Sequence, residues 1–150
     1  MYSKQQASLL KQSFWTAFGR YMAPVPGADG NKINWINYKT GVKHFYFRMD
    51  VTNQQASIAI VVTGIEEPTQ QSNFQKLIQL QPVLREKVGE VWDLQESVTD
   101  DHGRKIALVI KSVKGVNVFD EASWPAIISF FKPRLIALDA FWCEVKDLFE

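Results

Sequence analysis

Hydrophobic and polar residues alternate most regularly in the segment VKHFYFRMDV, residues 42–51. Successive side chains of a strand point to opposite faces of its sheet, so this alternation predicts a strand with two different faces. One face would contribute to a core and hold Phe45, Phe47, Met49 and Val51. The other would present hydrogen-bonding and ionisable groups, namely His44, Tyr46, Arg48 and Asp50.

Four more segments have the character of strands. Residues 33–38 precede a Lys-Thr-Gly turn, and residues 57–63 follow a polar turn at 52–55. With residues 42–51, these two predict an antiparallel meander of three strands. Residues 91–97 and 104–113 predict another pair, joined by the polar turn at 99–103.

Apolar residues at three- and four-residue spacing predict helices in the rest of the chain. The first covers residues 4–22 and ends before a segment with two prolines and two glycines. The second begins near Ser72 and ends at Gly89; Pro82 either kinks it or starts a new helix after Leu80. The third begins between residues 120 and 125 and runs almost to the C-terminus, with a bend expected at Pro133.

The resulting order, α-βββ-α-ββ-α, predicts an α+β fold. Residues 1–150 would form a single domain, in which helices cover one face of an antiparallel sheet of about five strands. Hydrophobic residues make up 46% of the chain, which is far too apolar for disorder. No apolar run approaches the roughly 20 residues of a membrane span. With a single cysteine and no signal-peptide pattern, the sequence indicates a cytoplasmic protein without a membrane partner.

The polar face of residues 42–51 is the main candidate for a binding site. Arg48 beside Tyr46 could bind a carboxylate or phosphate, with His44 as a proton carrier and Asp50 nearby. Trp35 could add a stacking surface if it lies on an exposed sheet face. The alternative is an ordinary solvated face, with Arg48 and Asp50 paired to neighbouring strands and Trp35 in the core.

Other residue clusters point to structure more than to chemistry. The run Asp100-Asp101-His102-Gly103 could hold a cation, but the same residue types are those of a hairpin turn. Cys143, beside Trp142 in an apolar helix, is expected to be a packed thiol. A restriction-type nuclease needs Glu-x-Lys on a strand, whereas the match at residues 144–146 falls in the last helix. No catalytic residue, metal ligand or cofactor site is therefore assigned.

Six ordered segments resemble the bacterial domain-of-unknown-function family 4268, and together they span nearly the whole chain. They are Phe14-Trp15, Phe45-x-Phe47, residues 57–60, residues 89–92, residues 104–107 and Trp124-Pro125. In larger members this domain looks like the C-terminal partner of a nuclease-like domain of the restriction-endonuclease type. The resemblance thus implies a link to DNA transactions or phage defence, and it implies no active-site residues.

These observations lead to the hypothesis of a non-catalytic binding or accessory domain whose partner is nucleic acid or a nuclease-like protein. The net charge of +1, without a basic run, does not by itself call for nucleic acid. One alternative is a small-molecule-binding protein or enzyme with a pocket on the polar sheet face. Another is a homodimer through the C-terminal helix, whose paired aromatics widen its apolar side: Phe130, Phe131, Phe141 and Trp142.

Overall fold

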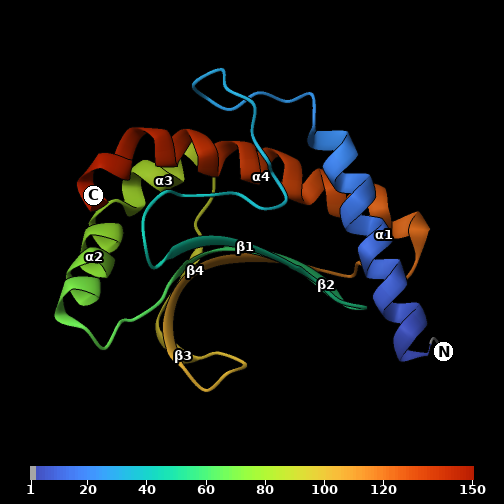
Figure 1. The fold of residues 1–150 in the computed structure, drawn as a ribbon, viewed down its shortest axis with the longest axis horizontal. Helices are drawn as coiled ribbons and strands as arrows, with labels where there is room; N and C mark the ends of the chain where they lie inside the picture. The colour runs from blue at the N-terminus through green and yellow to red at the C-terminus, as the bar shows by residue number, and fades with distance from the viewer. Residues whose placement is uncertain (1–2) are drawn as a thin grey trace.

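The computed structural model describes residues 3–150 and confirms the α+β class. Its elements are α1 (Lys4–Met22), β1 (Phe45–Val51), β2 (Gln55–Val62), α2 (Pro68–Gln79), α3 (Gln81–Val88), β3 (Asp93–Thr99), β4 (Lys105–Lys114), η1 (Glu121–Ser123), α4 (Trp124–Val145) and η2 (Lys146–Phe149). Within the described residues, four antiparallel strands form one sheet in the order β1-β2-β4-β3. Helices α3 and α4 lie over its convex face, α1 crosses α4 at one end of the sheet, and the sheet curls away from the helices so that its other face is concave (Figure 1).

The first helix begins at a capping box that the sequence contains. The Ser3 hydroxyl accepts a hydrogen bond from the Gln6 backbone N–H, and the Gln6 side chain accepts one from the Ser3 N–H. These two bonds satisfy donors that a helix start would otherwise leave unpaired. Phe14, Phe18 and Met22 follow at four-residue spacing and are fully buried. The helix predicted for residues 4–22 is confirmed.

The strand predicted for residues 33–38 is wrong, and this is why the sheet has four strands and not about five. Among the described residues, the pairing near this segment is limited to an isolated bridge between Pro26 and Lys32. The Asn34 side chain accepts the backbone N–H of Asn37, which closes a turn inside the predicted strand. Trp35 is buried, and its indole N–H donates to the Val25 carbonyl at 2.9 Å. The segment is an irregular connection whose aromatics pack into the core.

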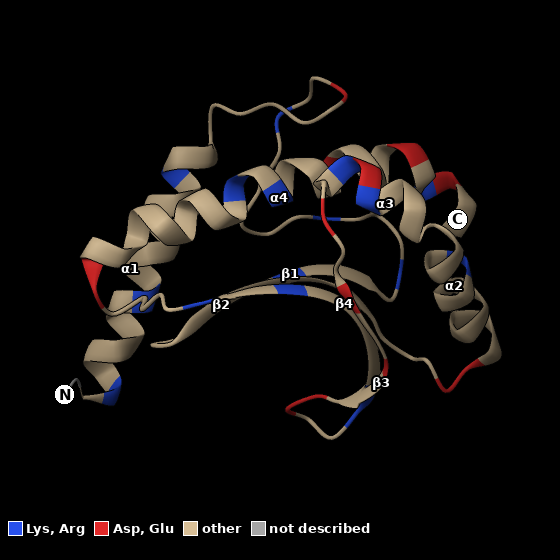
Figure 2. Cartoon of the chain, turned by 180° about the vertical axis from the view of Figure 1, so that it is seen from behind, with Lys and Arg blue, Asp and Glu red and all other residues tan. Residues whose placement is uncertain are grey.

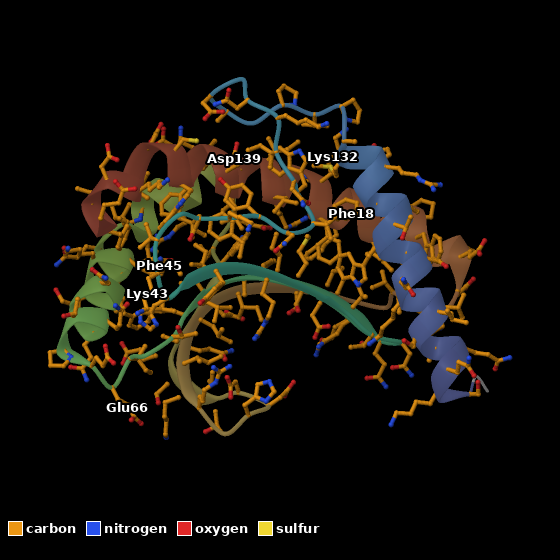
Figure 3. All side chains as sticks on the ribbon, in the orientation of Figure 1. Phe18, Lys43, Phe45, Glu66, Lys132 and Asp139 are labelled. Carbon is orange, nitrogen blue, oxygen red and sulfur yellow. The ribbon has the colours of Figure 1, made fainter. Side chains whose placement is uncertain are left out.

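The strand predicted for residues 42–51 is confirmed from Phe45 onwards, and so is its core face. Phe45 and Val51 are each 1% exposed, while Phe47 and Met49 are partly buried against the same core. Figure 3 shows Phe45 in the layer of side chains between the sheet and the helices. The two later strands and the strand at 57–63 are also confirmed, with shifts of one to two residues at their ends.

Pro82 starts a second helix instead of kinking a single one. α2 ends at Gln79, and α3 begins at Gln81 with the proline in its first turn, where its missing N–H costs nothing. α2 begins at Pro68, four residues before the predicted start. Gly89 ends α3 with φ of 74°, a left-handed conformation that glycine adopts without strain.

The last helix runs continuously from Trp124 to Val145 through Pro133. Its buried residues pack onto α1 and the sheet, for example Phe131 against Phe18 with ring centroids 5.6 Å apart. The aromatics that suggested a dimer are 0–6% exposed within the same chain. They belong to this chain's own core, so among the described residues these four side chains are not exposed to a second copy.

Candidate functional site

The candidate site lies on the concave face of the sheet, where the polar residues of β1 are located. The strand register places Tyr46 opposite Val61, which lies opposite Leu108, and places Arg48 opposite Ala59. Residues directly opposite one another share a face of the sheet. Tyr46 and Arg48 therefore stand at one edge of an apolar surface contributed by β2 and β4.

This apolar surface is buried although none of the helices within residues 3–150 covers it. Its central residues are 1–6% exposed and form a small cluster separate from the main core: Ala59, Val61, Ile106 and Leu108. The sheet curls strongly, and the hairpin between β3 and β4 turns back beneath it (Figure 1). Curvature therefore brings side chains of the concave face together and shields them from water.

A groove of about 350 Å³ lies on this face between β1 and the hairpin. This volume is at the lower end of those found for small-ligand sites. The groove is lined by Tyr46, Arg48, Val61, Thr63 and Ile106 together with Asp100 and Arg104 of the hairpin. Its floor is thus apolar, and its polar groups come from opposite walls.

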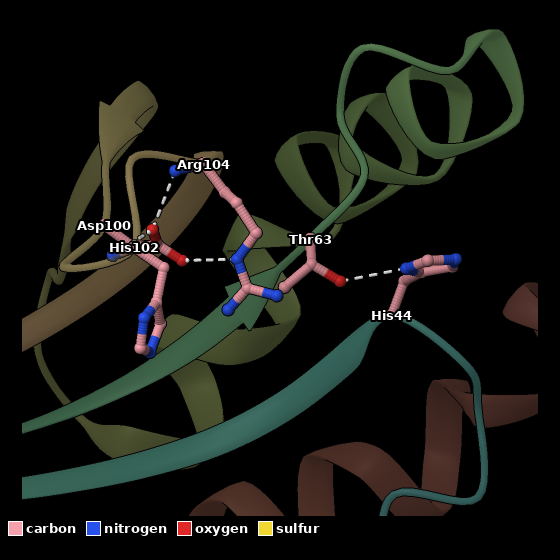
Figure 4. Close-up of polar contacts among 5 residues, drawn as sticks. All are labelled: His44, Thr63, Asp100, His102 and Arg104. Carbon is pink, nitrogen blue, oxygen red and sulfur yellow. Dashed lines mark hydrogen bonds and ion pairs between the residues drawn. The ribbon is translucent and has the colours of Figure 1, made fainter.

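The two arginines of the groove are held differently. The Arg104 Nε donates to Asp100 Oδ2 at 3.1 Å, which leaves the terminal nitrogens of the guanidinium without a partner among the described residues. Figure 4 shows this side chain extending from the hairpin toward Thr63. Arg48 is exposed and has no hydrogen bond or ion pair to any residue in the range 3–150. Both guanidinium groups are available to an anionic partner.

The run at 100–103 is a hairpin turn, as its residue types predict. Asp100 Oδ1 accepts the backbone N–H groups of His102 and Arg104 at 2.9 and 2.8 Å, and Gly103 has a left-handed φ of 76°. The backbone hydrogen bond from Arg104 is the main reason that the pKa of Asp100 is lowered. No group of three metal-ligating side chains occurs in the described part of the chain.

His44 does not share the face of Tyr46 and Arg48 in the way the alternation predicts. It precedes β1 and has φ of 73°, a left-handed conformation that is uncommon for a residue with a side chain. Its Nδ1 lies 2.9 Å from the Thr63 hydroxyl, on the far side of Thr63 from Arg104 (Figure 4). His44 thus contacts a residue of the groove without lining the groove itself.

Asp50 and Trp35 also lie away from the groove. The Asp50 carboxylate accepts the backbone N–H of Val51, and the residue is at the opposite end of β1. Trp35 is 2% exposed and belongs to the main core, so it offers no stacking surface. Of the five predicted site residues, Tyr46 and Arg48 are those that line the groove.

Sequence reasoning missed Arg104, although the signal for it was present. Arg104 is in phase with Ile106, Leu108 and Ile110 along β4, so it falls on the same face as they do. That face could be matched to Tyr46 and Arg48 only once the pairing of β2 with both β1 and β4 was known. Strand alternation alone does not say which faces meet.

A second cavity, of about 510 Å³, lies between α4 and the segment 23–41. Asp139 is 2% exposed there and accepts hydrogen bonds from the Tyr38 hydroxyl at 2.5 Å and the Ala28 N–H at 2.7 Å. Figure 3 shows Asp139 on α4 beside this segment. The carboxylate fastens the irregular segment to the helix, which is a structural role.

Cys143 lies at the same cavity and is exposed, so the prediction of a packed thiol is wrong. One side of α4 near its C-terminus is left uncovered, and Cys143 occupies it. Although the residue is exposed as a whole, desolvation of its sulfur on the side facing the cavity and the nearby Asp139 carboxylate raise the pKa of the thiol, which makes it a poorer nucleophile at neutral pH.

Charges of both signs are interspersed over the chain, and acidic residues of the hairpin stand beside its basic ones (Figure 2). Within residues 3–150, no helix combines the length and the apolar character needed to cross a bilayer.

A comparison with protein-family models matches residues 10–146 to the family described as Domain of unknown function (DUF4268). The match covers nearly the whole chain, and the chain belongs to this family. No protein of curated function and no solved structure matches it.

Proposed function

We propose that the chain is a non-catalytic binding domain whose ligand site is the groove on the concave sheet face, and that its ligand carries an anionic group. The observation that carries this proposal is the pair of arginines on opposite walls of one groove. Arg48 has no partner among the described residues, and Arg104 is oriented by Asp100. Planar guanidinium groups bind carboxylates and phosphates through paired, charge-assisted hydrogen bonds.

The groove's other residues support binding more than catalysis. Val61 and Ile106 offer an apolar floor, and Thr63 and Tyr46 offer hydroxyl groups. The described residues that line the groove include no histidine, cysteine or lysine to act as base or nucleophile. His44 Nδ1 lies 2.9 Å from the Thr63 hydroxyl, but a nucleophile is activated by a base that a third group orients, and no described residue hydrogen-bonds the other ring nitrogen of His44. The single carboxylate, Asp100, is engaged by the turn and by Arg104.

Nuclear magnetic resonance titration with inorganic pyrophosphate at low ionic strength tests this proposal. Backbone amide shifts are expected at Tyr46, Arg48, Thr63 and residues 100–104, and they should be abolished in an Arg48→Gln, Arg104→Gln double variant. Arg85→Gln is the matched control, because Arg85 is exposed on α3 in the helix layer. Shifts confined to other surfaces, or unchanged in the double variant, would contradict the proposal.

Single-stranded nucleic acid is the second candidate ligand. It is favoured by the exposed Tyr46 beside Arg48 on an open sheet face, since bases stack on aromatic side chains between phosphate contacts. Asp50 and Asp93 on the same face, and the net charge of +1, weaken it. An association with a nuclease-like protein or with DNA defence rests on the family resemblance alone.

Fluorescence anisotropy with labelled single- and double-stranded DNA and RNA tests the second candidate. Measurements at low salt are the most permissive, because phosphate contacts weaken as salt rises. Binding that is lost in Arg48→Gln and falls with salt would support it. The absence of binding at tens of micromolar protein would remove nucleic acid as a ligand.

A further inference from the structure

Tyr46 is the residue of the groove whose exposure calls for an explanation. Its side chain is 53% exposed, and it makes no hydrogen bond or ring contact within residues 3–150. The strand that carries it pairs with β2 along its whole length, so the ring is held on a rigid support. An aromatic ring in this position can stack on a flat ligand at little cost in conformational entropy.

The floor beside Tyr46 suits a flat apolar group. Val61 lies directly across from Tyr46, and the floor residues Val61 and Ile106 are 4% and 3% exposed. Ala59, opposite Arg48, has a short side chain that keeps the surface between the strands low. Because these side chains are already almost fully buried, a ring placed here would remove from water mainly its own apolar surface and the exposed face of Tyr46, which favours binding.

The spacing of ring and cation defines the rest of the ligand. Arg48 is two residues from Tyr46 on the same face, which corresponds to roughly 7 Å along a strand. Arg104 approaches from the hairpin on the other wall, and its terminal nitrogens are free because Asp100 engages only Nε. An anionic group about one sugar's length from a stacked ring would meet both guanidinium groups.

We infer that the groove binds a planar ring joined to a single anionic group, the chemistry of a nucleoside monophosphate. The inference rests on the proposed function and names the class of its ligand. Tyr46 stacks on the ring, Val61 and Ile106 lie beneath it, and Arg48 and Arg104 bind the phosphate. A volume of about 350 Å³ is sufficient for one such unit.

Isothermal titration calorimetry on the full chain tests the inference with four kinds of probe. They are the four ribonucleoside 5′-monophosphates, the corresponding nucleosides, inorganic pyrophosphate, and a single-stranded ten-nucleotide oligomer. At least one monophosphate is expected to bind more tightly than its nucleoside and more tightly than pyrophosphate. An oligomer that binds far more tightly than the monophosphate identifies a strand as the source of the ligand, and equal affinity identifies a free nucleotide; both agree with the inference.

Variants at position 46 separate stacking from general folding. Tyr46→Leu keeps an apolar side chain on the exposed strand and should weaken monophosphate binding by about fivefold to a hundredfold. Tyr46→Phe should retain it. Tyr21→Leu, which removes another exposed tyrosine from α1, is the control and should leave affinity unchanged.

Two results would overturn the inference while leaving the proposed function intact. One is pyrophosphate binding as tight as that of every monophosphate, and the other is monophosphate binding that Tyr46→Leu does not change. If neither pyrophosphate nor any monophosphate binds, both the inference and the proposed function fail.

Discussion

Asp139 shows how a single charged side chain fixes a long irregular segment. It lies on α4 within a stripe that also contains Leu135, Leu138 and Trp142, yet it is 2% exposed. A buried carboxylate is costly unless it is hydrogen-bonded. Here the donors come from the Ala28 backbone and from Tyr38, whose own pKa is raised by burial and by the hydrogen bond to Asp139.

Replacing Tyr38 by phenylalanine should therefore destabilise the fold. The Tyr38→Phe variant keeps the ring, which stacks on Phe47 at 4.7 Å, but removes one donor from the buried carboxylate. We expect a loss of about 1 to 3 kcal/mol in the free energy of unfolding, measured by urea denaturation. Tyr21→Phe, at an exposed hydroxyl, should change it by less than about 0.5 kcal/mol. Equal effects of the two variants would show that Asp139 does not depend on Tyr38.

Cys143 gives a second prediction that concerns one side chain. Burial and Asp139 raise the pKa of the thiol, whereas Lys146 lowers it. The Lys146→Gln variant should therefore raise the pKa further and leave less thiolate at any given pH. Its rate of alkylation by iodoacetamide at pH 8 should fall below that of the wild type, and its pH–rate curve should move to higher pH. A faster alkylation rate in the Lys146→Gln variant would contradict the conclusion that Lys146 lowers the pKa of the thiol. Lys105→Gln on β4 is the control and should leave the rate unchanged.

Individual side chains of the groove and of α4 show how far the sequence alone could place a residue. Tyr46 and Arg48 were placed correctly, because strand alternation fixes their common face. The position of His44 could not be read in this way, since its left-handed φ of 73° breaks the alternation one residue before β1 begins. Asp139 falls in a helical apolar stripe, but its donors come from residues 28 and 38, about a hundred positions earlier.

At the scale of elements, prediction succeeded where the local pattern and tertiary packing agree. Pro82 and Gly89 act through backbone conformation alone, so the helix boundaries that they set were within reach of the sequence. Residues 33–38 have the composition of a strand, yet no neighbouring strand pairs with them. Trp35 is buried in the main core and Tyr38 is partly buried against it instead, and a strand pattern cannot distinguish burial of this kind from burial in a sheet.

The connection between α3 and β3 is attached to α4 by an ion pair. Arg134 binds the Glu90 carboxylate through Nε and a terminal nitrogen at 2.8 and 3.0 Å, and the Trp92 indole donates to it at 2.9 Å. Burial opposes ionisation of Glu90, but the hydrogen bonds from Arg134 and Trp92 outweigh it, so the pKa of Glu90 is lowered.

This lowered pKa predicts how stability depends on pH. A carboxyl group with a depressed pKa in the folded state stabilises the fold above its unfolded pKa, near 4.5, and this contribution is lost as pH falls through the folded pKa. At pH 7, the Glu90→Gln variant should be less stable than the wild type by about 1 to 2 kcal/mol. Urea denaturation at pH 7 and at pH 3 should show a smaller difference at the lower pH. A constant difference would show that Glu90 contributes nothing through its charge.

At the scale of the whole molecule, the described residues form a large hydrophobic core and a second, small hydrophobic cluster. The main core lies between the convex face of the sheet and the helices, and the small cluster on the concave face is closed only by curvature and by the hairpin (Figure 1). The sequence predicted that helices would cover one face, but it did not predict that the other face would be hollowed. Curvature arises from how four strands coil together, which no single strand reveals.

Val61 and Val62 allow the two cores to be compared with identical side chains. They are neighbours on β2 that point to opposite faces; Val62 is fully buried under the helices, and Val61 is 4% exposed in the groove. Val62→Ala should cost about 2 to 3 kcal/mol, because it removes two methyl groups from a packed core and leaves a cavity. Val61→Ala should cost about 1 kcal/mol, because the open groove lets water or neighbouring side chains reach the space. Urea denaturation of both variants measures the two losses in the free energy of unfolding. Equal losses would mean that the concave face is packed as tightly as the main core and holds no groove for a ligand.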